Sequence, residues 1–64
     1  MVKVNGAELD IAGRSIAQYM ESANYDPARI AVELGGDIVF RSQYHETILN
    51  DGDILEIVSF VGGG

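Results

Sequence analysis

The sequence predicts a small α+β domain, in which a β-sheet is covered on one face by a single helix. Its 64 residues allow one domain with one thin core. A content of 47% hydrophobic and 22% charged residues is typical of a soluble globular chain. Segments with the two-residue period of strands lie on both sides of one segment with helical spacing. One short helix cannot cover two faces of a sheet, so we expect one face to stay open.

The amino-terminal segment predicts a β-hairpin. Residues 1–5 and 7–11 each alternate apolar and polar side chains, as half-buried strands do. Asn5-Gly6 separates them, and this dipeptide adopts the left-handed backbone that a two-residue hairpin turn requires.

A helix is expected to begin at Ser15. Ser15 and Gln18 have the spacing of a capping box, in which each side chain binds a free backbone N–H of the other residue. Asn24 and Pro27 close the segment after about two turns. The apolar side chains at helical spacing, expected in the core, are Ile16, Tyr19, Met20 and Ala23.

The second half of the chain predicts another hairpin and a last strand. Residues 30–34 alternate, residues 35–37 (Gly-Gly-Asp) form a turn, and residues 38–41 form the returning strand. Residues 42–49 are expected to be irregular or to form one short helical turn. Residues 50–53 (Asn-Asp-Gly-Asp) predict a turn whose acidic side chains bind backbone donors.

Residues 54–61 form the expected final strand, with alternate side chains on opposite faces. Leu55, Ile57 and Ser59 share one face, and Glu56 marks the other as the outer face. Val58 and Phe60 then place apolar groups where solvent favours polar ones, so we expect them to form a docking patch for partner proteins. The alternative is that they pack beneath residues 42–49.

Charge and composition exclude several function classes. Ten acidic residues against four basic ones give a net charge of −6, which repels nucleic acid and anionic lipid and suits a partner with a basic surface. No cysteine is present, so no disulfide, thiol nucleophile or thiolate-bound metal is expected. No apolar run has the length of a membrane span, and we expect a cytoplasmic protein without a deep catalytic pocket.

The three terminal glycines, Gly62, Gly63 and Gly64, are the most informative feature. Without side chains to pack, they are expected to form a flexible tail that can enter a channel too narrow for any Cβ atom. Such a tail delivers one reactive group, the α-carboxylate of Gly64, which must be activated, for instance by adenylation, before it reacts as an electrophile. A frayed terminus without function is the alternative.

The remaining candidates favour ordinary structural roles. His45 is expected to be a surface histidine, because there is no second histidine and no cysteine with which to form a metal or catalytic site. Asp51 and Asp53 only faintly resemble calcium ligands, and turn formation explains them better. Gly35-Gly36 is followed by neither a lysine nor a helix, so it predicts a hairpin turn rather than a phosphate loop.

In its order of segments the chain resembles the ThiS family of sulfur carriers in thiamin biosynthesis. The resemblance is densest in residues 49–58 (Leu-Asn-Asp-Gly-Asp-Ile-Leu-Glu-Ile-Val) and 59–64 (Ser-Phe-Val-Gly-Gly-Gly), and it includes residues 2–6 and 30–33. It implies a ubiquitin-like β-grasp fold with a mixed sheet over residues 1–61, with the helix on one face. Residues 62–64 would form the flexible glycine tail.

The resemblance also implies a non-enzymatic role with no bound cofactor. An E1-like adenylyltransferase (ThiF-like) would use ATP to activate the Gly64 carboxylate. Sulfur from a persulfide donor enzyme would replace AMP, and the Gly64 thiocarboxylate would supply a thiazole synthase (ThiG-like). Gly63 and Gly64 match the terminal Gly-Gly of the family, and Gly62 extends the tail by one residue.

Three alternatives stay open at this point. The small subunit of molybdopterin synthase uses the same terminal chemistry, although those proteins tend to be longer and often have prolines before the glycines. A covalent protein modifier would be attached to lysines through Gly64. The last alternative is a plain interaction domain with an idle tail.

Overall fold

The computed structural model describes residues 1–60, and Val61 and the three terminal glycines lie outside the described part. Two strands precede the helix and three follow it, in the order that the sequence predicts. The elements are β1 (Val2–Val4), β2 (Ala7–Leu9), α1 (Ile16–Ser22), η1 (a 3-10 turn, Pro27–Arg29), β3 (Ile30–Leu34), β4 (Asp37–Val39), η2 (a second 3-10 turn, Arg41–Gln43) and β5 (Ile54–Ser59).

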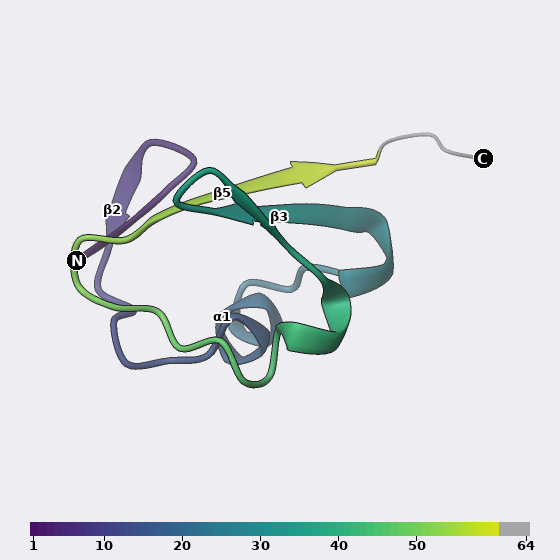
Figure 1. Cartoon of the computed structure of the whole chain (residues 1–64), viewed down its shortest axis with the longest axis horizontal. Coiled ribbons are helices and arrows are strands. Elements are labelled where there is room, and N and C mark those ends of the chain that lie inside the picture. Colours follow the sequence, from purple (N-terminus) through teal and green to yellow (C-terminus); the bar gives the residue numbers. More distant parts are fainter. Residues whose placement is uncertain (61–64) are drawn as a thin grey trace.

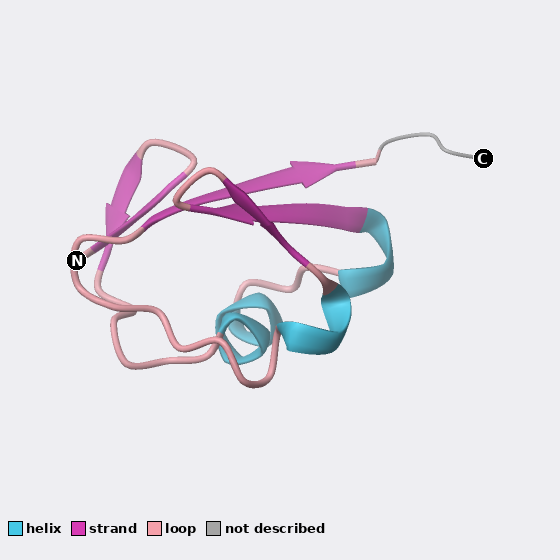
Figure 2. Ribbon diagram, viewed as in Figure 1, coloured by secondary structure: helices cyan, strands magenta, loops and turns pink. Residues whose placement is uncertain are grey.

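The strands form one layer, and α1 with the long connections forms the other (Figure 1). The strand order is β2-β1-β5-β3-β4, so the last strand of the chain lies at the centre of the sheet. β1 and β5 are parallel, and the other neighbours are antiparallel, which makes the sheet mixed. Within residues 1–60, helices and long connections lie on one side of the sheet only (Figure 2).

The first hairpin is confirmed, with shorter strands than expected. Asn5 and Gly6 have φ values of 49° and 87°, the left-handed backbone of a tight hairpin turn. This turn sets the register in which Val2 lies opposite Leu9. β2 ends at Leu9, but Ile11 is still buried, because the chain turns under the sheet after the strand ends.

The helix begins as predicted and ends earlier. The Gln18 backbone N–H donates to Ser15 Oγ (3.1 Å), and the Ser15 N–H donates to Gln18 Oε1 (2.9 Å), so the capping box is confirmed. Ala23, expected in the core, is exposed instead. The reason is that the backbone leaves the helical conformation at Ala23 (ψ 3°) and turns at Asn24 (φ 62°).

The core lies between the inner face of the sheet and α1. Ile16 and Met20 of the helix and Val32 and Leu55 of the central strands are at most 1% exposed. Tyr19, predicted as a core residue, is also buried. The complete set of buried apolar residues is Val2, Val4, Ile11, Ile16, Tyr19, Met20, Ile30, Val32, Tyr44, Leu49, Leu55 and Ile57.

The second hairpin differs from the prediction at its end. The strand expected over residues 38–41 is β4, which runs from Asp37 to Val39, and Arg41 already belongs to η2. Gln43 explains the early end: its backbone N–H donates to the Phe40 carbonyl (2.8 Å), and its Oε1 accepts from the Phe40 N–H (3.1 Å). These bonds turn the chain away from β3.

The connection over residues 42–49 is irregular, as expected, but two of its side chains enter the core. Tyr44 and Leu49 are 4% and 0% exposed. The Ala17 N–H donates to the Tyr44 carbonyl (3.0 Å), and the Leu49 N–H donates to the Arg14 carbonyl (2.8 Å). Backbone hydrogen bonds to α1 and to the loop before it therefore fix this connection on the helix side of the molecule.

A side chain marks the point at which β1 and β5 separate. The Asn5 side chain takes the place of a strand neighbour: its Oδ1 accepts from the Ile57 N–H (2.8 Å), and its Nδ2 donates to the Ile57 carbonyl (3.1 Å). Beyond Ile57, β5 continues beside β3 alone, with Ser59 opposite Ile30. The Phe60 N–H then donates to the Arg29 carbonyl (2.8 Å), which holds the strand direction to the end of the described chain.

Candidate functional site

The reactive end that the sequence predicts, Gly62 to Gly64, lies outside the described residues. The structure does describe the strand that leads to it. β5 is paired with β3 up to Ser59, and four residues remain after Phe60. An extended chain spans about 3.3 to 3.6 Å per residue, so Gly64 can lie at most about 14 Å from Phe60. Any enzyme that acts on Gly64 must therefore approach the end of β5.

Val58 and Phe60 are 54% and 59% exposed, on the outer face that strand alternation predicts. The alternative that they pack beneath residues 42–49 is wrong. That connection (green in Figure 1) lies with α1 on the opposite side of the sheet, held by the hydrogen bonds to Ala17 and Arg14.

Two further apolar side chains join them, which the sequence prediction missed. Ile38 and Phe40 are 67% and 66% exposed. Ile38 lies opposite Glu33 on β3, and Phe40 follows Val39, which packs toward the core, so both take the outer face. Ile38, Phe40, Val58 and Phe60 are called the outer apolar patch below. The alternation of residues 37–40 indicates that Ile38 and Phe40 share one face of their strand. That this face adjoins Val58 follows only from the strand order, in which β3 lies between β4 and β5.

The outer face also holds a pair of carboxylates. Glu33 of β3 and Glu56 of β5 lie directly opposite each other, at a position where Cβ atoms are about 4.5 to 5.5 Å apart. The ion pairs among residues 1–60 are Met1–Asp51 and Arg29–Asp26, so neither glutamate is in one. Lys3 lies opposite Ile54 on β5 and opposite Glu8 on β2. This face therefore presents acidic groups next to the outer apolar patch.

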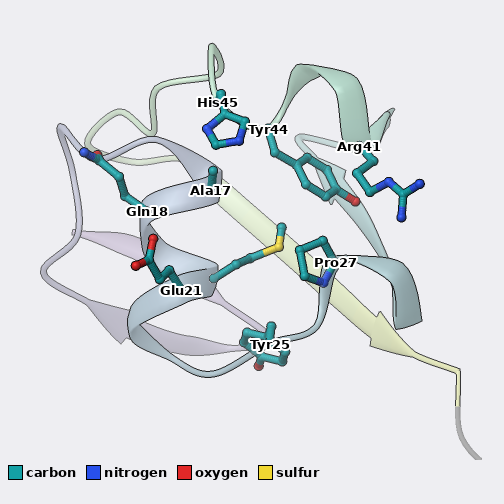
Figure 3. Close-up of a pocket in the computed structure, with 9 residues that line it drawn as sticks. Ala17, Gln18, Glu21, Tyr25, Pro27, Arg41, Tyr44 and His45 are labelled. Carbon is teal, nitrogen blue, oxygen red and sulfur yellow. The ribbon is translucent and has the colours of Figure 1, made fainter.

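A groove on the helix side has a volume of about 470 Å³ (Figure 3). Ala17, Gln18 and Glu21 of α1 line it, together with Tyr44 and Pro27 from other segments. Burial raises the pKa of the Tyr44 hydroxyl, and the nearby Arg41 guanidinium opposes this shift. The groove and the outer apolar patch meet at one edge, where a hollow of about 290 Å³ is lined by Ile38 and Phe40 together with Pro27, Arg41 and Tyr44.

The other candidate residues take structural or surface positions. His45 is exposed at the rim of the groove. Asp51 binds the Met1 ammonium group, which lowers the pKa of the Asp51 carboxyl, and Asp53 Oδ2 accepts from the Asn50 N–H (2.8 Å). The predicted turn role is therefore confirmed for Asp53, whereas the Asp51 side chain binds the amino terminus of the chain instead of a backbone N–H of the turn. Residues 1–60 contain no group of three histidine, aspartate or glutamate side chains that could hold a metal ion.

No helix within residues 1–60 has the length and apolar character needed to cross a membrane.

Comparison with known proteins decides the family. The model of the ThiS family matches residues 2–64, which is nearly the whole chain and includes the terminal glycines. This chain belongs to the ThiS family. The sulfur carrier protein ThiS of Bacillus subtilis is 33% identical over 66 aligned positions, which cover all of both chains. The crystal structure of the thiamine biosynthesis protein ThiS of Geobacter metallireducens superposes with a TM-score of 0.78 at 28% identity, over 98% of this chain and 97% of that one.

A further relative is a larger protein. The thiazole synthase of Paramagnetospirillum magneticum is 39% identical over 62 residues, which are 95% of this chain but 19% of that protein. The chain thus spans about a fifth of the length of this relative. The ThiS matches confirm the predicted family and the β-grasp fold, and they make the chain a sulfur carrier of thiamin biosynthesis, a carrier protein rather than a catalyst.

Proposed function

We propose that this ThiS-family chain carries sulfur as a thiocarboxylate on Gly64 and supplies it for thiazole formation. One observation supports this most: the family match continues through Gly64, so the terminal Gly-Gly is part of the resemblance. The alignment with the Bacillus carrier covers the whole length of both chains, so it includes these glycines.

The proposed chemistry takes place on the backbone carboxylate. It attacks the α-phosphorus of ATP in an adenylyltransferase, releasing pyrophosphate and leaving an acyl adenylate. The terminal sulfur of a donor persulfide attacks the acyl carbon and expels AMP. A thiol of a partner then attacks the donor's sulfur in this acyl disulfide, which forms a new disulfide and releases the Gly64 thiocarboxylate. ATP is thus bound by the partner and not by the carrier, and this cycle is placed in the cytoplasm, where ATP is available.

We propose that residues 1–61 form the folded domain that partners recognise, and that Gly62, Gly63 and Gly64 form a flexible tail that enters their active sites. Glycines offer no side chain to obstruct a narrow channel. Because the tail has a maximum reach of about 14 Å from Phe60, a partner that takes Gly64 into its active site also covers the end of β5. Val58 and Phe60 lie there and are exposed, so we assign them to docking with both partners.

The thiazole synthase relative favours this pathway over the molybdopterin alternative, since a domain similar to this chain occurs within a protein of that name. We therefore propose that a thiazole synthase is the acceptor and that a ThiF-like adenylyltransferase and a persulfide-forming enzyme act before it. Copurification with the large subunit of a molybdopterin synthase instead of a thiazole synthase would contradict this choice of pathway.

The test is mass spectrometry of the intact chain after incubation with the adenylyltransferase of the same genome, ATP and a persulfide donor. We expect the replacement of one oxygen by sulfur at Gly64. Adding one residue after Gly64 should abolish the product and leave the fold unchanged, while the same residue added before Met1 serves as the control. Repeated absence of the thiocarboxylate from the unmodified chain would refute the proposal.

Docking has its own test. Replacing Phe60 with aspartate should weaken binding to the adenylyltransferase and to the thiazole synthase without loss of thermal stability, because Phe60 is exposed. Replacing the buried Ile57 with aspartate is the contrasting control and should unfold the domain. If the Phe60 variant unfolds, Phe60 belongs to the fold and not to the docking surface.

A further inference from the structure

We infer that Glu33 and Glu56, which lie beside the outer apolar patch, together bind a basic side chain of the partner protein. The inference rests on the proposed function, because the partner is the protein that takes the tail. It adds the chemical group that the partner must present at the centre of its contact surface.

Glu33 and Glu56 lie opposite each other on β3 and β5, the two strands that lead toward the end of the sheet where the tail begins. The next outward-facing pair along the same strands is Ala31 opposite Val58. A partner that contacts Val58 therefore also reaches the carboxylates, which are two residues away on each strand.

The carboxylates of Glu33 and Glu56 repel each other. Like charges directly opposite on a sheet destabilise it, and neither glutamate forms an ion pair within residues 1–60. The strand pairings place three carboxylates, those of Glu8, Glu33 and Glu56, on this face against the single ammonium group of Lys3. Lys3 lies opposite Glu8 and one diagonal step from Glu56, and within residues 1–60 it forms no ion pair with Glu33 or Glu56.

Exposed apolar side chains surround the two carboxylates. Ile38 lies next to Glu33 on β4, and Ile54 and Val58 precede and follow Glu56 on the same face of β5. All three are at least half exposed. A docked partner that covers them removes water around the carboxylates, where charge-assisted hydrogen bonds strengthen. Two carboxylates on adjacent strands suit the forked donors of an arginine guanidinium.

The arrangement discriminates between partners. A surface with a basic side chain at this place gains paired hydrogen bonds, whereas a surface without one would bury two charges that repel each other. The apolar patch alone would accept any apolar surface of suitable shape. The carboxylate pair therefore determines which protein can use the patch.

The experiment measures binding to the thiazole synthase and to the adenylyltransferase encoded in the same genome, each immobilised as a probe. The test variant is Glu33→Gln with Glu56→Gln, which keeps side-chain shape and removes both charges. The matched control is Glu21→Gln with Glu46→Gln, which removes two charges from exposed residues on the helix side. Val58→Asp reports on the docking face itself.

We expect the test variant to bind one or both probes about tenfold more weakly, or weaker still, than the unmodified chain does. The control should change binding by less than about twofold. The affinity of the test variant should also depend less on salt. Its thermal stability should equal or exceed that of the unmodified chain, because the repulsion is removed. The single variants E33Q and E56Q provide the same comparison if the double variant does not fold.

The possible failures are distinguishable. If the test variant binds both probes as tightly as the control and Val58→Asp does not, the docking face stands and the role of the glutamates in binding a basic side chain is refuted. If Val58→Asp also binds normally, the docking face is refuted as well. The mass-spectrometric assay of Gly64 tests the carrier function separately from both.

Discussion

The two faces of β5 are built from similar residues and have opposite surroundings. Leu55 and Ile57 on the inner face are 0% and 6% exposed, whereas Ile54 and Val58 on the outer face are 50% and 54% exposed. The inner residues pack against α1 and the connection that contains Tyr44 and Leu49. A strand residue therefore belongs to the core only where a helix or a connection covers its face, however hydrophobic its side chain is.

An open apolar face has a cost, because it exposes surface that would be stabilised by burial. Contiguous apolar groups on a small monomer are typical of interaction sites. In this domain Val58 and Phe60 lie where β5 ends, so the surface left uncovered by the fold is the one that the proposed partners would approach.

The largest expected effect tests the contrast directly. Replacing Leu55 with alanine should lower the free energy of unfolding by about 2 to 5 kcal/mol, enough to unfold most of a domain of this size. Val58→Ala on the opposite face should change it by less than about 0.5 kcal/mol. Urea denaturation followed by circular dichroism measures both. Equal losses for the two variants would show that the outer face is covered in solution.

An effect of intermediate size is expected where the Asn5 side chain binds the backbone of β5. Asn5→Gly keeps the left-handed backbone and removes both side-chain hydrogen bonds to Ile57. The loss should be about 1 to 3 kcal/mol, because two backbone groups of a central strand lose their partner. Asn5→Asp retains the acceptor for the Ile57 N–H, but at neutral pH it places a carboxylate oxygen against the Ile57 carbonyl, so it should also destabilise the fold. A stable Asn5→Gly variant in urea denaturation would mean that water replaces the side chain.

The smallest effect concerns the covered side at alkaline pH. Burial raises the pKa of Tyr44 in the folded state, while an unfolded tyrosine titrates near pH 10, as free tyrosines do. The contribution of the neutral hydroxyl is complete below about pH 10 and is lost as the pH rises through the folded-state pKa. Tyr44→Phe should therefore flatten the fall of the melting temperature between about pH 10 and pH 12. Identical pH profiles for the two proteins would refute this.

Local features of the fold could be predicted from the sequence. The Asn5-Gly6 turn and the capping box of Ser15 and Gln18 depend on residues that touch their near neighbours, and both are confirmed. The face assignment of β5 is also correct, because strand alternation needs no knowledge of the rest of the chain. The terminal glycines, together with the segments before them, indicate the family to which the chain belongs.

Features that depend on distant residues could not be predicted. Ile38 and Phe40 join Val58 only because β3 lies between β4 and β5, and nothing near them in the sequence states this order. Tyr44 and Leu49 enter the core because their backbone binds α1 and the loop before it, so their segment has no period of its own. β4 ends early because the Gln43 side chain accepts a hydrogen bond from the Phe40 N–H. The alternation of residues 38–41 gives no sign of this bond.

The central position of β5 has a mechanical consequence. Traction on the chain end runs along the strand, between parallel β1 on one side and antiparallel β3 on the other. The load is then shared by many hydrogen bonds in shear, instead of opening them one by one as at an edge strand. Optical-tweezers pulling from the end of β5 should need more force than pulling from β4. If the chain end enters a partner as proposed, this arrangement lets the folded domain resist unfolding each time the end is pulled.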